Sequence, residues 1–158
     1  MVQPCFLHSQ GGRRTVTDFT ALNKFVPAKL FCKLDAVHGY FQLALDERSS
    51  KLTTFLIQQG RYLRAPMGLN ASSDEWCRQS DIIIAGLPYA MKIVDDTIIW
   101  AATEAELEER VSTILQRCAD NNITISRKKF EMGNSIQFTG HIISDGGIRP
   151  DDDKFAAL

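Results

Sequence analysis

The stretch KIVDDTIIW, residues 92–100, places two adjacent carboxylates between two runs of β-branched and aromatic residues. Runs of this kind predict strands, and the Asp-Asp pair between them predicts the tip of a hairpin. Taken alone, the pair favours an ordinary turn, because Asp tolerates turn geometry and is well solvated there. We therefore expect a β-hairpin that carries Asp95 and Asp96 at its tip.

A third carboxylate upstream changes the interpretation of this hairpin. Asp35 ends the stretch LFCKLD, residues 30–35, which predicts another strand. Magnesium prefers hard oxygen ligands and often takes only one or two protein carboxylates. Two such ions, roughly 3.5–4 Å apart, can promote phosphoryl transfer to a sugar hydroxyl. We expect Asp35, Asp95 and Asp96 to converge around divalent metals, with the backbone carbonyl of Ala36 as a further ligand.

The composition sets the class of protein. With 158 residues, 44% of them hydrophobic, the chain can bury one ordinary core, so a single domain is expected. The net charge of −1 does not indicate a general nucleic-acid binder, although Arg13-Arg14 and residues 127–129 are local basic stretches. The four cysteines form no CxxC pair, which argues against zinc and favours reduced thiols in an intracellular protein. No signal peptide or membrane-spanning run is expected.

The remaining pattern predicts an alternation of strands and helices. Ser72 with Glu75, and Thr103 with Glu106, have the spacing of a capping box and predict two helix starts. Gly39 is expected to permit a tight turn after the strand of Asp35. In the second helix the residues expected to face the core are Leu107, Val111, Leu115 and Cys118. Strands are expected at 14–19, 30–35 and 123–126, hairpins at 52–57/61–64 and 135–139/141–144, and helices at 72–85, 103–121 and from 151.

This order predicts the α+β class, with an antiparallel sheet and helices packed on one face. The class alone decides no function, because it is shared by many unrelated proteins.

Four motifs stand in order along the chain and give it a family resemblance. They are Asp35 with Gly39-Tyr40-Phe41-Gln42-Leu43, then Pro66-Met67-Gly68-Leu69, then Val94-Asp95-Asp96, and last Phe138-Thr139-Gly140-His141. Together they resemble the reverse transcriptase of gypsy-type LTR retrotransposons, over nearly everything from Arg14 to Lys154.

The resemblance implies the palm of a polymerase with a remnant of the fingers. Residues 1–29 would be the partial fingers segment, and residues 30–158 the palm with the start of the following element. The implied activity is that of an RNA-directed DNA polymerase, with two Mg²⁺ ions, or Mn²⁺, assisting nucleotidyl transfer from a dNTP to a primer 3′-hydroxyl. The implied partners are dNTP, an RNA or DNA template-primer duplex and the thumb, connection and ribonuclease H parts of a Pol polyprotein, which are missing after Leu158. The expected location is intracellular, in the cytoplasm or in virus-like particles, and not in a membrane.

The resemblance also implies roles for single residues. Asp35, Asp95 and Asp96 would be the catalytic metal ligands, together with Ala36. Nucleotide binding would involve Arg14, Tyr40, Met67, Gly68 and Lys129, with Tyr40 as the steric gate against a 2′-hydroxyl. Gly140 and His141 would grip the primer end. Without the family context, the residues alone favour an exposed strand arginine at Arg14, a core aromatic at Tyr40, a solvated turn at Lys129 and a structural histidine at His141.

The chain departs from the family pattern in several places. Ile93 stands where a tyrosine is usual, and residues 8–11 replace a usual Lys-Lys-Asp-Gly. The connections near 26–29 and 61–64 look short. Two hypotheses therefore stay open: an RNA-directed DNA polymerase domain, and a degenerate or domesticated remnant that keeps the palm fold and nucleic-acid binding without polymerising. A hydrolytic phosphodiesterase is a more distant third, because no suitable nucleophile or base is present.

Overall fold

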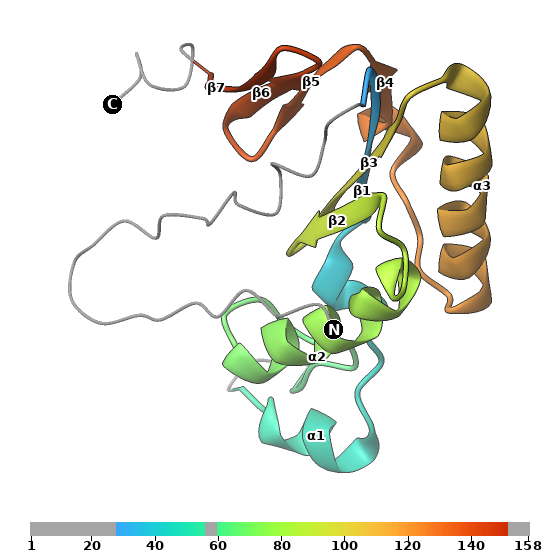
Figure 1. The fold of residues 1–158 in the computed structure, drawn as a ribbon. Coiled ribbons are helices and arrows are strands. Elements are labelled where there is room, and N and C mark those ends of the chain that lie inside the picture. The colour runs from blue at the N-terminus through green and yellow to red at the C-terminus, as the bar shows by residue number, and fades with distance from the viewer. Residues whose placement is uncertain (1–27, 56–59, 152–158) are drawn as a thin grey trace.

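The computed structural model describes residues 28–55 and 60–151 (Figure 1). In this part of the chain the strands form two antiparallel sheets, one four-stranded with the order β2-β3-β1-β4 and one three-stranded with the order β5-β6-β7. The elements are β1 (Leu30–Asp35), η2 (Gly39–Gln42), α1 (Glu47–Leu52), α2 (Asn70–Ile84), β2 (Ala90–Ile93), β3 (Asp96–Ala101), α3 (Glu104–Asp120), η3 (Arg127–Lys129), β4 (Glu131–Gly133), β5 (Ser135–Phe138), β6 (His141–Ser144) and β7 (Gly147–Pro150).

The predicted strand at residues 30–35 is β1, and it lies inside the four-stranded sheet between β3 and β4. Successive side chains of a strand point to opposite faces. Along β1, Cys32 and Leu34 therefore share one face, while Phe31 lies on the other, and all three are fully buried. A strand buried on both faces has a position fixed by its apolar side chains, so its end at Asp35 is fixed as well.

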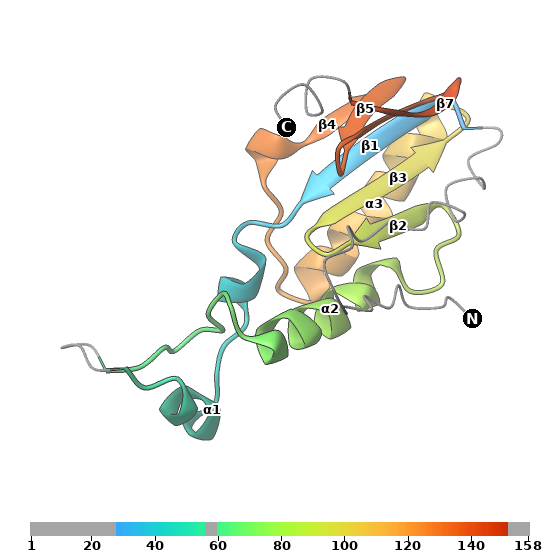
Figure 2. The same cartoon turned by 90° about the vertical axis from the view of Figure 1, so that its left-hand side faces the viewer.

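Helices cover one face of this sheet, as the sequence predicted (Figure 2). The apolar cluster on this face joins the strands to Trp76 and Ile83 of α2 and to Leu107 and Ile114 of α3. The expectation for Leu115 was wrong. Ile114 takes the core position with no exposed surface, whereas Leu115 is 39% exposed and lines a shallow groove with Phe130 and Met132. Seven residues make about two turns of an α-helix, so Ile114 lies almost directly below Leu107, whereas Leu115 is turned further round the helix.

The three-stranded sheet packs on the other face. Phe31, Ile98 and Trp100 of the first sheet form an apolar cluster with Ile136, Phe138 and Ile143 of β5 and β6. Figure 2 shows β5 to β7 in front of β1, with α3 behind the sheet. The cluster includes neither Asp35 nor Asp96, which stand at the other end of β1 and β3. The second sheet therefore covers part of this face of the first sheet. The apolar cluster between the two sheets does not cover the end where Asp35 and Asp96 lie.

One predicted helix start is confirmed and the other is wrong. The Thr103 hydroxyl accepts from the Glu106 N–H at 3.3 Å, so α3 begins where its capping signature placed it. By contrast, α2 already begins at Asn70, because the Leu69 carbonyl accepts from the Ser72 N–H at 3.0 Å. Ser72 is buried inside the first turn, and Glu75 binds Arg78 instead of capping the helix.

Of the two other predicted hairpins, one is confirmed and one differs from the prediction. The hairpin at 135–144 is confirmed, and its tip residues Thr139 and Gly140 have φ values of 46° and 82°, as tight hairpin turns require. Of the hairpin expected at 52–57/61–64, the described residues show a bridge between Thr54 and Arg61, and Leu52 belongs to α1 rather than to a strand. Residues 123–126 form one bridge rather than a strand, and the sequence did not predict β4 or β7.

Some expectations lie outside the described residues: the strand at 14–19, Arg14, most of the fingers segment 1–29 and the helix after 151. Within the residues that the structure describes, no helix is long and apolar enough to cross a membrane.

Candidate active site

The central hairpin forms between β2 and β3, but its tip differs by one residue from the expected Asp95-Asp96, because Asp96 is already the first residue of β3. Its last cross-strand pair is Ile93 with Asp96, so Val94 and Asp95 make the two-residue tip. Val94 has a φ of 53°, a left-handed conformation that a β-branched residue rarely adopts. Residues held in such conformations cluster at functional sites. Ile93, the residue that departs from the family pattern, packs against the apolar cluster between the two sheets.

Asp35 and Asp96 meet across the strand pair. They are direct partners in the register of β1 and β3, so their side chains leave the sheet on the same face. The Ala36 N–H donates to the Asp95 carbonyl at 3.3 Å, which ties the end of β1 to the hairpin tip. Three carboxylates from segments far apart in sequence therefore lie at one end of the sheet.

The side chain of Asp95 packs against Gly39, which also packs against Trp76 of α2. A Cβ on Gly39 would lie 2.4 Å from Asp95 Oδ1 and 2.8 Å from a ring carbon of Trp76. The left-handed residue of this turn is His38, with a φ of 49°. The sequence predicted that Gly39 serves the turn, but what requires glycine is the close approach of Asp95 and Trp76.

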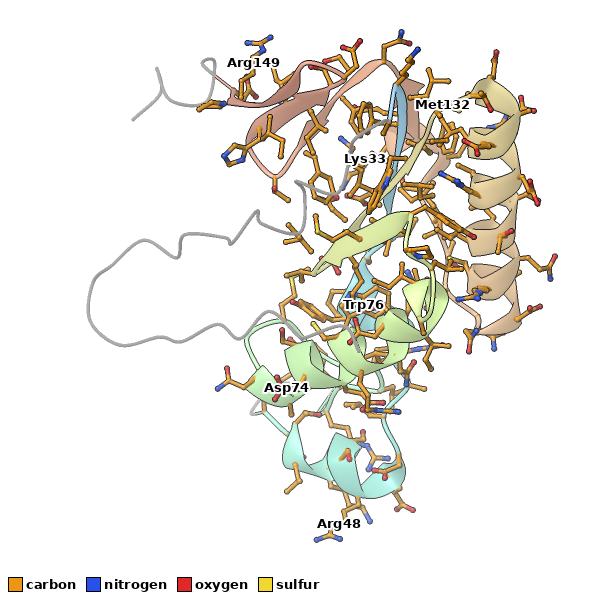
Figure 3. The ribbon with its side chains drawn as sticks, viewed as in Figure 1. Lys33, Arg48, Asp74, Trp76, Met132 and Arg149 are labelled. Atoms are coloured by element: carbon orange, nitrogen blue, oxygen red, sulfur yellow. The ribbon has the colours of Figure 1, made fainter. Side chains whose placement is uncertain are left out.

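Trp76 is 1% exposed and points from α2 toward the strands (Figure 3). Its Nε1 and the Oδ1 of Asp95 are both buried and form no hydrogen bond of ordinary geometry within the described residues. Burial raises the pKa of Asp95 above its ordinary value, and the charge of Asp35 adds to the rise. The indole N–H of Trp76 lowers this pKa, as do two nearby lysines, without cancelling the rise.

Asp96 is perturbed in the same direction. Burial raises its pKa, and the carboxyl of Asp35 opposite raises it further, while Lys33 and Lys129 oppose the shift. Asp95 and Asp96 are therefore carboxyl groups whose charged form is disfavoured, first by burial and then by the neighbouring Asp35. Carboxylate and carbonyl oxygens are hard ligands, so the donor set fits a divalent cation in its chemistry.

The side chains do not form a ready chelate in this arrangement. Among the described residues, no group of three or more His, Cys, Asp or Glu side chains is gathered as a metal site. Asp95 is packed against Gly39 and Trp76, and the carboxylate of Asp35 is already engaged by a lysine.

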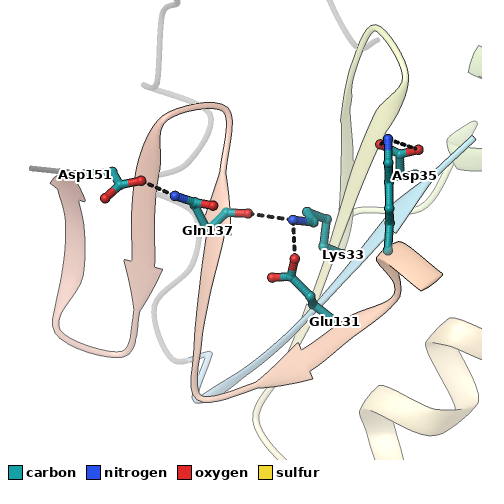
Figure 4. A network of polar contacts seen from close by, with 6 residues as sticks. Lys33, Asp35, Glu131, Gln137 and Asp151 are labelled. Atoms are coloured by element: carbon teal, nitrogen blue, oxygen red, sulfur yellow. Dashed lines mark hydrogen bonds and ion pairs between the residues drawn. The ribbon is translucent and has the colours of Figure 1, made fainter. Parts of the chain in front are cut away.

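That lysine is Lys129, at the end of η3. Its Nζ lies 3.0 Å from Asp35 Oδ1 and 2.9 Å from Asp35 Oδ2 (Figure 4). The hydrogen bond to Asp35 and the charge of Asp35 raise the pKa of Lys129. The Ser126 N–H, just before η3, donates to the Asp35 carbonyl at 2.8 Å. The sequence singled out Lys129, and the structure brings it to the carboxylates.

A polar network that the sequence did not predict links β1 to the β5–β6 hairpin (Figure 4). Lys33 shares a face with Asp35, and its Nζ contacts Glu131 at 2.6 Å and the Gln137 carbonyl at 3.1 Å. The Gln137 amide donates to Asp151, which is 4% exposed. The Asp151 N–H in turn donates to the Gly140 carbonyl at 3.1 Å. The network therefore runs from the carboxylate strand to the hairpin tip.

Lys92 is a second residue that sequence reasoning missed, although it opens the stretch quoted first. Its side chain is only 6% exposed, and its Nζ contacts Asp81 at 2.8 Å and Ser80 Oγ at 2.5 Å. Ser80 also donates to the Trp76 carbonyl at 2.6 Å. The buried ammonium thus ties the root of the hairpin to α2. The available signal was a lysine inside an otherwise apolar strand.

The other predicted residues lie around this centre. Tyr40, in η2, is half-buried and packs against the helix-side core. Met67 is 63% exposed, and Gly68 follows it in the loop before α2 with a φ of 90°. Gly140 lies at the tip of the β5–β6 hairpin, and His141 Nδ1 lies 3.3 Å from the Thr139 carbonyl. Among the predicted residues that the structure describes, Asp35 contacts Lys129 and faces Asp96, and Ala36 is hydrogen-bonded to the Asp95 carbonyl.

Comparisons with known proteins show which family the chain resembles. The family model described as "Reverse transcriptase (RNA-dependent DNA polymerase)" matches residues 3–143. The Retrovirus-related Pol polyprotein from transposon 412 of Drosophila melanogaster is 31% identical over 87% of this chain and 12% of its own length. The corresponding polyprotein from transposon gypsy is 30% identical over 92% of this chain and 16% of its own length. The chain thus spans less than a fifth of either relative.

Solved structures share the fold. A foamy viral protease-reverse transcriptase in complex with dsDNA matches 95% of this chain and 33% of its own, with a TM-score of 0.77 and 18% identity. The same kind of protein in complex with an RNA/DNA hybrid matches 79% of this chain and 18% of its own, with a TM-score of 0.74. At this level of identity the likeness shows the fold alone, which is the palm-like α+β fold that the sequence predicted.

Proposed function

Because this chain belongs to the reverse transcriptase family, we propose that it carries the catalytic centre of an RNA-directed DNA polymerase. The reaction would join a dNTP to a primer 3′-hydroxyl and release pyrophosphate. The observation that carries the proposal is the pairing of Asp35 with Asp96 beside a hairpin tip that presents Asp95. In this proposal residues 30–158 are the palm and residues 1–29 belong to the fingers.

The proposed metal ligands are Asp35, Asp95, Asp96 and the carbonyl of Ala36. When bound, two Mg²⁺ or Mn²⁺ ions would lower the pKa of the primer hydroxyl and neutralise charge on the triphosphate and the leaving pyrophosphate. Two observations support this assignment: burial, and after it the carboxyl group of Asp35, raises the pKa of Asp95 and of Asp96, and Asp95 Oδ1 is buried with no hydrogen bond of ordinary geometry in the described chain.

Nucleotide and primer contacts extend the proposal. We assign the triphosphate to Lys129 and Arg14, the sugar to Tyr40, and the nucleotide base to the Met67-Gly68 loop. The ammonium of Lys129 already lies at Asp35, where a leaving phosphate oxygen would need a positive charge or a proton. Gly140 and His141 would hold the primer end, which suits a tight hairpin joined to β1 through the Lys33 network.

The proposed partners are an RNA or DNA template-primer duplex and the further parts of a Pol polyprotein. Duplex binding is supported by the fold shared with reverse transcriptases solved in complex with dsDNA and with an RNA/DNA hybrid. An intracellular location, in the cytoplasm or in virus-like particles, belongs to the same proposal.

The test is incorporation of dTTP on an rA/dT template-primer with Mg²⁺ or Mn²⁺. We expect weak extension by the wild-type chain and none by Asp95→Asn. Asp120→Asn, an exposed change on α3, is the matched control and should extend like the wild type. If wild type and Asp95→Asn were indistinguishable, the chain would be the degenerate remnant. Binding to the duplex that weakens steeply as salt rises would then identify a retained nucleic-acid surface.

A further inference from the structure

Lys129 places a positive charge where a divalent cation would have to meet Asp35. Its Nζ is 3.0 Å and 2.9 Å from the two carboxylate oxygens, so neither oxygen is left to coordinate an ion without competition. Any cation that uses this carboxylate must displace the ammonium or share the carboxylate with it. Sharing is unfavourable because the two positive charges would stand a few ångströms apart.

The two partners differ in how firmly they are held. The Asp35 side chain is 14% exposed, and its backbone is fixed by β3 on one side and by the Ser126 N–H on the other. The Lys129 side chain is 64% exposed and extends from a three-residue helix. An ion pair with one well-solvated partner is weak. The ammonium can therefore leave while the carboxylate stays in place.

The other two ammonium groups near the carboxylates are tied elsewhere. Lys33 is held by Glu131 and the Gln137 carbonyl, and Lys92 by Asp81 and Ser80. Their side chains are only 14% and 6% exposed. Lys129 is thus the cation, within the described chain, that combines contact with a proposed ligand and freedom to move.

We propose that Lys129 is a tethered competitor of the divalent cation at Asp35, so that cation binding releases Lys129 and the ammonium lowers cation affinity. This inference rests on the proposed metal site. An anion that binds the released ammonium, such as a phosphate oxygen, therefore raises cation affinity. By linkage, the cation raises the affinity for that anion by the same factor. Lys129 therefore couples occupancy of the cation site to occupancy of a neighbouring anion site.

The test measures Mn²⁺ affinity, by the electron paramagnetic resonance signal of free Mn²⁺, with no nucleotide present. Lys129→Gln removes the charge and keeps much of the length, and we expect it to bind Mn²⁺ about two- to fivefold more tightly than the wild type. Lys129→Arg keeps the charge and should bind like the wild type. Lys128→Gln is the matched control, since Lys128 is an exposed neighbour in no ion pair among the described residues.

A second comparison assigns the effect to Asp35. In an Asp35→Asn background, Lys129→Gln should leave the remaining Mn²⁺ affinity unchanged, because the competed ligand is gone. Lys129→Ala repeats the test with a different side chain, and circular dichroism confirms that each variant is folded.

The outcomes separate this inference from the proposed function. If wild type binds Mn²⁺ at a site lost in Asp95→Asn, but Lys129→Gln and Lys129→Ala bind no more tightly, the competition is refuted while the metal site stands. If the wild type has no Mn²⁺ site that depends on Asp95, the proposed function itself fails, and this inference fails with it.

Discussion

Asp35 and Asp96 lie directly opposite each other on β1 and β3, with their side chains on the same face of the sheet. Like charges in this position destabilise a strand pair, because the side chains are close and cannot turn apart. In this chain the pair stands at the end of β1, which is buried on both faces. The arrangement therefore lowers the stability of the chain in the absence of a cation.

Asp96→Asn should stabilise the chain when no divalent ion is present. The substitution removes one of two facing charges and gives Asp35 an amide donor in its place. We expect the free energy of unfolding to rise by about 0.2–1 kcal/mol. Urea unfolding with EDTA measures it, with Asp120→Asn as control. A lower stability than the wild type would show that the facing carboxylates do not repel in the folded chain.

Gly39→Ala should destabilise the chain, because the added Cβ would lie 2.4 Å from Asp95 Oδ1 and 2.8 Å from Trp76. Overpacking of this kind costs about 1–3 kcal/mol. Gly146→Ala is the matched control, since its added Cβ meets only Ser144 Oγ, at 3.6 Å. Thermal unfolding of the two variants side by side gives the comparison, and equal losses would contradict the close approach at Gly39.

Lys33→Met should loosen the β5–β6 hairpin. The variant loses the contacts to Glu131 and to the Gln137 carbonyl, at 2.6 Å and 3.1 Å. Hydrogen bonds to charged groups contribute about 1.5–3 kcal/mol each, and partial exposure places the loss at the lower end. Amide hydrogen exchange should become faster in residues 135–144, while Lys33→Arg keeps most of the protection. Unchanged exchange in this hairpin would mean that the network does not hold it.

The phase of α3 is tested by Ile114→Ala and Leu115→Ala. Ile114 is fully buried, whereas Leu115 is 39% exposed, so the neighbouring truncations should differ strongly. We expect Ile114→Ala to lower the free energy of unfolding by about 2–5 kcal/mol and Leu115→Ala by well under half of that. Denaturant unfolding measures the loss of stability in both variants. A larger loss for Leu115→Ala than for Ile114→Ala would mean that Leu115 faces the core, as the sequence predicted.

Much of the site could be predicted because its elements carry strong local signals. Residues 30–35 form an apolar strand that ends at Asp35, and residues 92–100 contain two apolar strand segments on either side of a tight turn, so both patterns are easy to detect. Thr103 with Glu106 likewise predicted the start of α3, where the cap forms. The local sequence pattern predicted the wrong residue where a tertiary contact, rather than the pattern, sets the start of a helix. Ser72 has capping spacing, but burial and an earlier turn override it.

The contacts that tune the site had no such signal. The approach of Trp76 to Asp95 depends on how α2 packs against the hairpin, which sequence spacing does not encode. The Lys33 network joins residues about a hundred positions apart, through strands β4 and β5, and the sequence did not predict β4. The pairing of Lys129 with Asp35 was accessible only through the family resemblance, because a basic RKK stretch by itself predicts a solvated turn.

The central claim is that Asp35, Asp95 and Asp96 form one divalent-cation site. The most direct measurement is an anomalous difference map at the manganese edge, from crystals grown with Mn²⁺ and repeated on Asp95→Asn. We expect density between the ends of β1 and β3, in contact with Asp35 and Asp96 and lost or weakened in the variant. Manganese bound only elsewhere on the chain, with the three carboxylates free of it and Lys129 still at Asp35, would show that these carboxylates are not a divalent-cation site.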